Sequence, residues 1–362
     1  MSGTIIAYNS AMLLYIHIPF CDSKCSYCSF NSYVDKFPLR RAYMEALQRQ
    51  LGFELERFAA GPGSIETLFI GGGTPSTVAP ELYAPLFGML EPYLAEGAEI
   101  TTEANPNSAT AAWLAGMRAL GVNRVSFGVQ SFDPGKLKRL ARAHTADDAL
   151  RALRDARSAG FEHLSLDLIY GVEGDTKALL QHDLDTAFSL PIDHLSAYAL
   201  TIEEGTPFAA TPEVAHEKLK LTTWLFDQIR AHGFEQYEIS NFGRYRSRHN
   251  LGYWQYKDYI GLGSGAVGFL KDTRFYPTQS VEGYIADPLQ IREEHLEPDE
   301  ITTEKLFLGL RSVVGVDPAI LDAAQSGRAE LLVAEGKLRR EGERYTNPDY
   351  LLSDELALFI LA

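Results

Sequence analysis

Short apolar runs rich in β-branched and aromatic residues alternate with longer segments of helical periodicity through the first two-thirds of the chain. Segments such as 42–58 and 182–190 place apolar residues at i, i+3 and i+4, which predicts amphipathic helices. A strand–helix repeat of roughly 30 residues predicts parallel strands joined by right-handed crossovers. A partial (β/α)6 barrel and a doubly wound open sheet both fit six such units. The six expected strands are residues 13–18, 67–72, 99–104, 124–130, 164–171 and 194–200.

The last third of the chain changes character. A helix is expected at about 213–231, and residues 235–295, rich in Tyr, Arg and Gly, are typical of loops around short elements. From residue 300 a helical segment, a hairpin and a last helix follow, the order of a small winged-helix-like α+β unit. We therefore expect an α/β core at 1–234, a connecting segment at 235–297 and a small C-terminal α+β domain at 298–362.

Composition narrows the classes of function. The chain has 362 residues, 46% of them hydrophobic, which is ordinary for a globular protein with a sizeable core. Its formal net charge of −15, with 7 basic and 11 acidic residues in 300–362, argues against nucleic-acid binding by any part of it. The first residues lack a basic region before an apolar stretch, and we find no apolar run long enough to cross a bilayer. We expect a cytoplasmic protein.

All three cysteines of the chain lie in one short segment, HIPFCDSKCSYCSF. Cys21, Cys25 and Cys28 form C-x-x-x-C-x-x-C directly after the first expected strand. Three thiolates so close together can surround one metal centre, and since no fourth cysteine exists, an iron–sulfur cubane here would keep one iron open. A zinc ion completed by His17 or another histidine is the alternative.

The cysteine segment resembles the cluster motif of the radical S-adenosylmethionine (SAM) superfamily, and YIHIPFCDSKCSYCSFNSY is similar to the group around oxygen-independent coproporphyrinogen III oxidase. The resemblance implies a 4Fe–4S cluster whose open iron is completed by SAM. It also implies a partial (β/α)6 barrel of the TIM-like type. In that group Tyr15 would lie near the cluster and SAM, and His17 would form a hydrogen bond close to the cluster.

Polar residues follow several of the expected strands at their carboxyl ends, where parallel α/β folds bind ligands. They are the GGGTP segment at 71–75, Glu103, Gln130, Arg142 and Asp167. A carboxylate can bind the ammonium of SAM, a guanidinium its carboxylate, and Gln and Asp its ribose hydroxyls.

The same positions match the family pattern. By that resemblance Gly72, Gly73, Thr74 and Glu103 hold the methionyl part of SAM. Arg142 resembles the arginine that binds the carboxylate, and Gln130 and Asp167 resemble the ribose contacts. No residue is assigned a catalytic role.

Two features separate the chain from the decarboxylating oxidases. Those enzymes carry a further cysteine two positions after the last cluster ligand, where this chain has Phe30. RHNLGYW (248–254) resembles the H-N-x-x-Y-W signature of the heme chaperone subgroup, HemW, which implies that His249 binds heme. We therefore expect a heme chaperone; the alternative is a coproporphyrinogen III oxidase that decarboxylates propionates by radical chemistry.

The expected partners are heme, apo-hemoprotein recipients and an electron donor for the cluster, and the family also suggests a homodimer. Arg244, Arg246 and Arg248 form a basic run within an acidic chain. Heme propionates or an anionic membrane surface would suit this run, the latter as a peripheral contact. A solvated loop whose arginines pair with nearby acids is the alternative.

Overall fold

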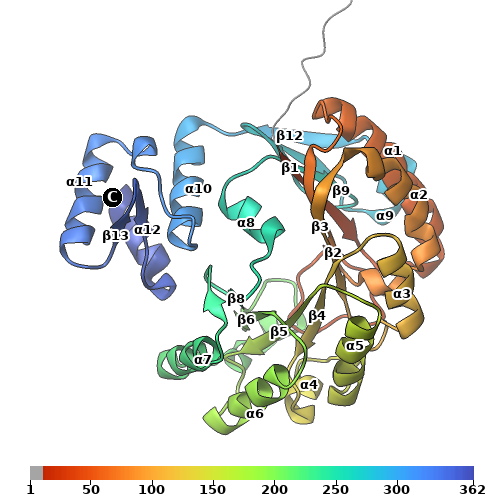
Figure 1. The fold of residues 1–362 in the computed structure, drawn as a ribbon, viewed down its shortest axis with the longest axis horizontal. Coiled ribbons are helices and arrows are strands. Elements are labelled where there is room, and N and C mark those ends of the chain that lie inside the picture. The colour runs from red at the N-terminus through yellow and green to blue at the C-terminus, as the bar shows by residue number, and fades with distance from the viewer. Residues whose placement is uncertain (1–10) are drawn as a thin grey trace, which may run out of the picture.

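The computed structural model describes residues 11–362, and its core is a curved sheet covered by helices (Figure 1). The first six strands are β1 (Met12–Ile18), β2 (Ile65–Gly72), β3 (Leu94–Ala104), β4 (Arg124–Gln130), β5 (His163–Tyr170) and β6 (His194–Ala199). The helices between and after them are α1 (Arg40–Arg57), α2 (Pro80–Leu90), α3 (Ala111–Ala119), α4 (Pro134–Arg139), α5 (Ala146–Ser158), α6 (Lys177–Phe188) and α7 (Leu219–Ala231).

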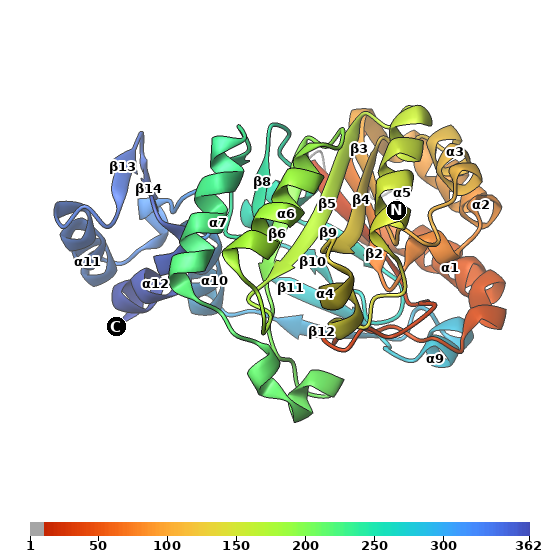
Figure 2. The same cartoon turned by 90° about the horizontal axis from the view of Figure 1, so that it is seen from below.

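The order of the strands decides between the two architectures that the periodicity left open. β1 to β6 are parallel and lie side by side in sequence order, without the reversal that a doubly wound sheet requires. Figures 1 and 2 show the helices on one side of this sheet, which curves around the opposite, concave side. The expectation of a partial (β/α)6 barrel is confirmed.

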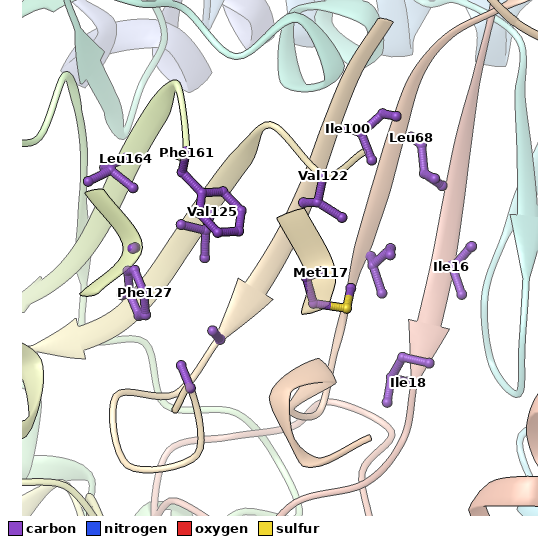
Figure 3. Close-up of a cluster of buried hydrophobic side chains, with 14 of the residues drawn as sticks. Ile16, Ile18, Leu68, Ile100, Met117, Val122, Val125, Phe127, Phe161 and Leu164 are labelled. Atoms are coloured by element: carbon purple, nitrogen blue, oxygen red, sulfur yellow. The ribbon is translucent and has the colours of Figure 1, made fainter. Parts of the chain in front are cut away.

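Side chains of the six strands alternate between the two faces of the sheet. Ile16 of β1, Leu68 of β2 and Val125 of β4 are fully buried in the main apolar core. Figure 3 shows these residues near Met117 of α3, on the helix-covered face. The intervening positions, such as Tyr15, Thr67, Glu99 and Glu103, are mostly polar, so the concave face carries the chemistry.

Residues 235–295 extend the same sheet at both ends. β7 (Glu235–Gln236) and β8 (Asn241–Gly243) pair beyond β6, and β9 (Tyr259–Leu262) pairs parallel to β1. The remaining elements of this segment are α8 (Arg248–Trp254), β10 (Gly268–Leu270), β11 (Thr273–Pro277), α9 (Val281–Ala286) and β12 (Ile291–His295). Figure 1 shows α8 within the concavity of the sheet. β10, β11 and β12 continue the sheet beyond β9.

The C-terminal residues form a smaller unit beside the barrel (Figure 1). Its elements are α10 (Pro298–Leu310), α11 (Ala323–Ala334), the hairpin β13 (Arg339–Glu341) and β14 (Arg344–Thr346), and α12 (Ser353–Leu361). It has an apolar core of its own, which includes Leu306, Leu332 and Leu356. This is the α+β order expected of the winged-helix-like domain.

Two details bear on the sequence-based expectations. The helix expected from about residue 213 begins at Leu219, because Pro212 starts a separate 3-10 turn and Ala215 bridges to Val172. In residues 11–362 no helix is both long and apolar enough to span a bilayer. The expectation about the N-terminal segment concerns residues 1–10 in part, and these lie outside the described residues.

Candidate functional site

The cysteine loop begins where β1 ends, at the carboxyl edge of the sheet. Cys21 is buried, Cys25 and Cys28 are half-buried, and the backbone N–H of Cys28 donates to the carbonyl of Cys25 (3.2 Å). Among residues 11–362 no three His, Cys, Asp or Glu side chains form a ready-made metal site. The three thiols share one loop.

A glycine turn at the end of β2 lies directly against this loop. A Cβ on Gly73 would come within 3.0 Å of the Cys21 sulfur, and one on Gly72 within 2.6 Å of the His17 ring. Gly72 also has φ of +108°, a conformation that side-chain-bearing residues rarely adopt. The glycines are needed here because the two loops approach each other too closely for side chains.

A ring of polar contacts joins the cysteine loop to residues that follow β2 and β3 and to Arg142, which follows α4. Thr74 Oγ1 lies 3.4 Å from the Cys21 sulfur and accepts from Asn105 Nδ2 (3.1 Å). Arg142 in turn donates to Asn105 Oδ1 (2.7 Å) and to the Cys25 sulfur (3.1 Å). Thr74 and Arg142, both predicted from the sequence, are thus brought to the cysteines.

Asn105 is a member of this ring that the sequence analysis missed. It follows β3 two positions after Glu103, so the two side chains have the same parity along the strand. That spacing was the available signal. Tyr27, between the second and third cysteines, was missed as well, and its hydroxyl accepts from Arg142 (3.4 Å).

Two carboxyl groups, Glu103 and Asp167, lie next to each other inside the barrel. Burial, reinforced by the Asp167 charge, raises the pKa of Glu103 to about 8, and burial raises the pKa of Asp167. The backbone N–H of Gly72 donates to Glu103 (3.1 Å), and Ser126 donates to Asp167 (3.3 Å). A bound cation such as an ammonium would favour the ionised form of this pair.

Unpaired polar atoms also lie at the carboxyl ends of β1 to β6, which we call the mouth of the barrel. Among residues 11–362, the buried Gln130 Oε1 and Arg142 Nε have no hydrogen-bond partner. Gln130 also has φ of +69° at a register shift between β4 and β5. Buried polar groups are normally paired, and strained backbone concentrates at binding sites. Together with the donor set of three thiols, these atoms fit a cluster and a polar ligand such as SAM.

Tyr15 and His17 point from β1 toward the same place. His17 Nε2 donates to the carbonyl of Asn31 (2.7 Å), so its Nδ1 accepts from the Tyr15 hydroxyl (3.0 Å). Burial lowers the pKa of His17. Because both ring nitrogens are engaged, this arrangement does not favour His17 as the fourth ligand of a zinc ion.

His249 is held deep in the concavity by the short helix α8. Its Nδ1 lies 2.8 Å from Thr67 Oγ1 and its Nε2 lies 3.0 Å from the Tyr253 hydroxyl. The ring is 1% exposed, and burial lowers its pKa to about 3. The imidazole is therefore neutral throughout the physiological pH range.

Glu99 of β3 fixes the start of α8. Its carboxylate accepts from the backbone N–H groups of Arg248 (2.8 Å) and His249 (3.0 Å) and from the Tyr245 hydroxyl (2.6 Å). Burial opposes ionisation of this carboxyl, but the nearby Arg124 charge and these hydrogen bonds outweigh burial and lower its pKa. Glu99 thereby anchors the helix that carries His249.

A large cavity connects the cysteine loop with α8. It has a volume of ≈ 1230 Å³ and reaches from Tyr15, Gly72 and Glu103 to His249. Much of its wall is aromatic, supplied by Phe69, Tyr253, Tyr256, Tyr259, Phe269 and Phe307. Phe30 lies at its edge and is 62% exposed. Such a cavity suits a large, flat and partly apolar ligand.

The basic run at 244–248 is used within the fold. Arg244, Arg246 and Arg248 each contact a nearby group of the chain. Their partners are, in order, the carbonyl of His232 (3.0 Å), the carboxylate of Glu235 (2.8 Å) and the carbonyl of Gly97 (2.7 Å). Of the two interpretations, these contacts favour a structural loop.

Comparisons with known proteins agree with the geometry. A model of the radical SAM superfamily matches residues 15–187. The chain is 35% identical over 319 residues to the heme chaperone HemW of Bacillus subtilis, which covers 83% of this chain and 84% of that protein. It is 41% identical over 265 residues to HemW of Escherichia coli, which covers 70% of this chain and 69% of that protein.

Among solved structures, coproporphyrinogen III oxidase (HemN) from Escherichia coli, described as a radical SAM enzyme, matches with a TM-score of 0.82. The match covers 98% of this chain and 91% of that one, at 20% identity, and shows the shared fold. On the sequence relatives and the superfamily match, the chain belongs to the HemW family of heme chaperones within the radical SAM superfamily.

Proposed function

We propose that the protein binds heme in the cavity between the cysteine loop and α8 and passes it to apo-hemoproteins. The observation that carries this proposal is His249, a neutral histidine at the inner end of a ≈ 1230 Å³ cavity with aromatic walls. Neutral imidazole is a common axial ligand of heme iron, and aromatic side chains pack well on a flat macrocycle.

The contacts of His249 indicate how it would present a nitrogen to iron. When Nδ1–H donates to Thr67 Oγ1, Nε2 keeps its lone pair and accepts from the Tyr253 hydroxyl. Binding then replaces the hydrogen bond to Tyr253, whose side chain has to turn aside. Thr67 fixes the tautomer and the orientation of the ring, as partners of metal-bound histidines commonly do.

As a member of the radical SAM superfamily, the chain uses a 4Fe–4S cluster and SAM as cofactors. When bound, the cluster supplies electrons to SAM. We propose that Cys21, Cys25 and Cys28 hold the cluster.

The SAM contacts follow from the same mouth of the barrel. Glu103 would accept the ammonium of SAM, Arg142 would donate to its carboxylate, and Gln130 and Asp167 would bind the ribose hydroxyls. The unpaired Gln130 Oε1 and Arg142 Nε support this assignment, as does the buried Glu103. Tyr15, Gly72, Gly73 and Thr74 would shape the adjoining wall.

The alternative activity is oxidative decarboxylation of coproporphyrinogen III. The likeness to HemN shows the fold alone. By the family resemblance, the exposed Phe30 stands where the oxidases carry a cysteine. We therefore place the decarboxylase second.

We also propose a cytoplasmic location, an electron donor for the cluster, and release of heme to apo-hemoproteins. The names of the relatives support heme and its recipients as partners. Homodimerisation and a peripheral membrane contact stay predictions from the family resemblance. The contacts of the three arginines at 244–248 lend no support to the membrane contact.

The test is a heme titration of anaerobically reconstituted protein, followed by absorption spectroscopy. We expect the wild type to give a saturable heme spectrum that His249→Ala loses while keeping its cluster. His216→Ala is the matched control, because His216 is exposed and lies outside the cavity. A His249→Ala protein that binds heme with wild-type affinity and spectrum would contradict the proposal.

A further inference from the structure

The two ends of the cavity are lined by different ionisable groups, buried carboxyl groups at one end and cations at the other. The end near the cysteine loop holds Glu103, with Asp167 close behind it. The other end, formed by β9 to β11 and α10, is lined by Lys257 and Arg274, and the Lys305 ammonium lies 5.1 Å from the centre of the Tyr256 ring there. We call this second end the cationic end.

Contacts between side chains show that these cations gather at one place. Arg274 forms an ion pair with Glu304, and the same carboxylate accepts from the Tyr256 hydroxyl (2.6 Å). Lys257, the residue after Tyr256, forms an ion pair with Glu66. Lys257 and Arg274 thus line the cavity in ion pairs with Glu66 and Glu304, and Glu294 lies opposite Arg274 in the sheet.

The ion pairs at the cationic end are accessible. The side chains of Lys257 and Arg274 are 32% and 27% exposed. Ion pairs at such partly exposed positions contribute little to stability, so a ligand carboxylate can replace Glu66 or Glu304 at small cost.

An aromatic wall connects His249 with the cationic end. The ring centroids of His249 and Tyr253 are 4.8 Å apart, and those of Tyr253 and Tyr259 are also 4.8 Å apart. The ring centroid of Phe269 lies 6.0 Å from that of Tyr259 and 5.0 Å from that of Tyr256. Phe269 is also paired across the sheet with Arg274. A flat ligand on this wall, with its metal at His249, extends toward the cations.

We propose that Lys257 and Arg274 bind the carboxylate groups of the tetrapyrrole, which fixes its orientation with the carboxylates away from the cysteine loop. This inference rests on the proposed heme site. At the opposite end, the buried carboxyl groups of Glu103 and Asp167 offer no positive charge to a ligand carboxylate.

Lys24 is the competing cation, since it also lines the cavity. Its ammonium already donates to the carbonyl of Phe30 (2.7 Å) and to the hydroxyl of Ser32 (2.9 Å). These bonds hold the loop that follows the cysteines, so Lys24 has a structural task that a ligand carboxylate would disturb.

The experiment compares heme with heme dimethyl ester, whose carboxylates are uncharged. We expect the wild type to bind heme about tenfold or more tighter than the ester. In the double variant Lys257→Gln/Arg274→Gln this preference should disappear through loss of heme affinity, with the ester affinity and the His249-dependent spectrum unchanged. Lys24→Gln is the control and should keep the preference.

A second variant guards against a folding defect in the first. Glu304→Gln releases Arg274 from its ion pair and should tighten heme binding without affecting the ester. A wild type that binds both ligands equally, or a Lys24→Gln protein that loses the preference, overturns the inference while leaving the heme site intact. Heme binding that is indifferent to His249→Ala would instead overturn the proposed function, and the inference with it.

Discussion

The mouth of the barrel and the short helix α8 in its concavity face the same cavity, yet they differ in whether their buried polar groups have hydrogen-bond partners. At the mouth, Gln130 Oε1 and Arg142 Nε are buried without partners among residues 11–362, and Glu103 is a buried carboxyl with a raised pKa. At α8, both nitrogens of His249 and both oxygens of Glu99 are hydrogen-bonded. At the mouth, polar atoms are left for a ligand to pair, whereas at α8 they are paired within the fold, and under the proposed function His249 would give up one of its hydrogen bonds when heme binds.

The largest expected effect concerns the mouth. Cys25→Ala should abolish the 4Fe–4S absorbance of anaerobically reconstituted protein, because no fourth cysteine can replace the lost ligand. Heme binding through His249 should persist. Iron and sulfide analysis beside the spectrum checks this, with the exposed Ser23→Ala as the control. Stoichiometric zinc without iron in the wild type would falsify the cluster assignment.

Asp167→Asn should weaken SAM binding about tenfold to a hundredfold while leaving the cluster in place. A neutral amide accepts a weaker hydrogen bond from a ribose hydroxyl than a carboxylate does. Equilibrium binding of SAM to the reconstituted protein measures the effect. Glu162→Gln, an exposed change before β5, is the control. An unchanged SAM affinity would remove Asp167 from the site.

Glu99→Gln should lower stability by about 1–3 kcal/mol and weaken heme binding, because the amide cannot accept all the hydrogen bonds that the carboxylate accepts at the start of α8. Denaturant unfolding and heme titration measure the two effects. The exposed Glu96→Gln on the same strand should change neither. A stability loss with an unchanged heme spectrum and affinity would mean that Glu99 supports the fold but does not position His249.

A further effect is the pH dependence of stability. Between pH 4.5 and about 8, the unfolded Glu103 carboxyl is ionised while the folded one keeps its proton. Stability from this group is therefore present below its ordinary pKa and is lost as the pH rises toward about 8. As the pH rises across this window, the free energy of unfolding of Glu103→Gln should increase relative to that of the wild type, by on the order of 1–4 kcal/mol without SAM. Thermal unfolding at several pH values checks this, and a constant difference between the two proteins would contradict it.

Much of this account could be predicted from sequence because it depends on local pattern. The period-two alternation of β1 to β6 and the polar residues at their carboxyl ends predicted where the barrel opens, and Cys21, Cys25 and Cys28 predicted the loop that we propose holds the cluster. Glu99 and Asn105 were not predicted as site residues, because the groups that they bind, in α8 and Arg142, are distant in sequence. The placement of β9 beside β1 also depends on long-range pairing, which periodicity does not encode. For the same reason the cavity and its cationic end emerged from the structure alone.

We propose that the protein carries heme in a radical SAM fold. Heme binding and coproporphyrinogen III turnover should therefore be measured side by side on one anaerobically reconstituted sample with SAM and a reductant. The account predicts stoichiometric heme binding that depends on His249, with no conversion to protoporphyrinogen IX. Appreciable conversion by a sample that does not retain heme would contradict it.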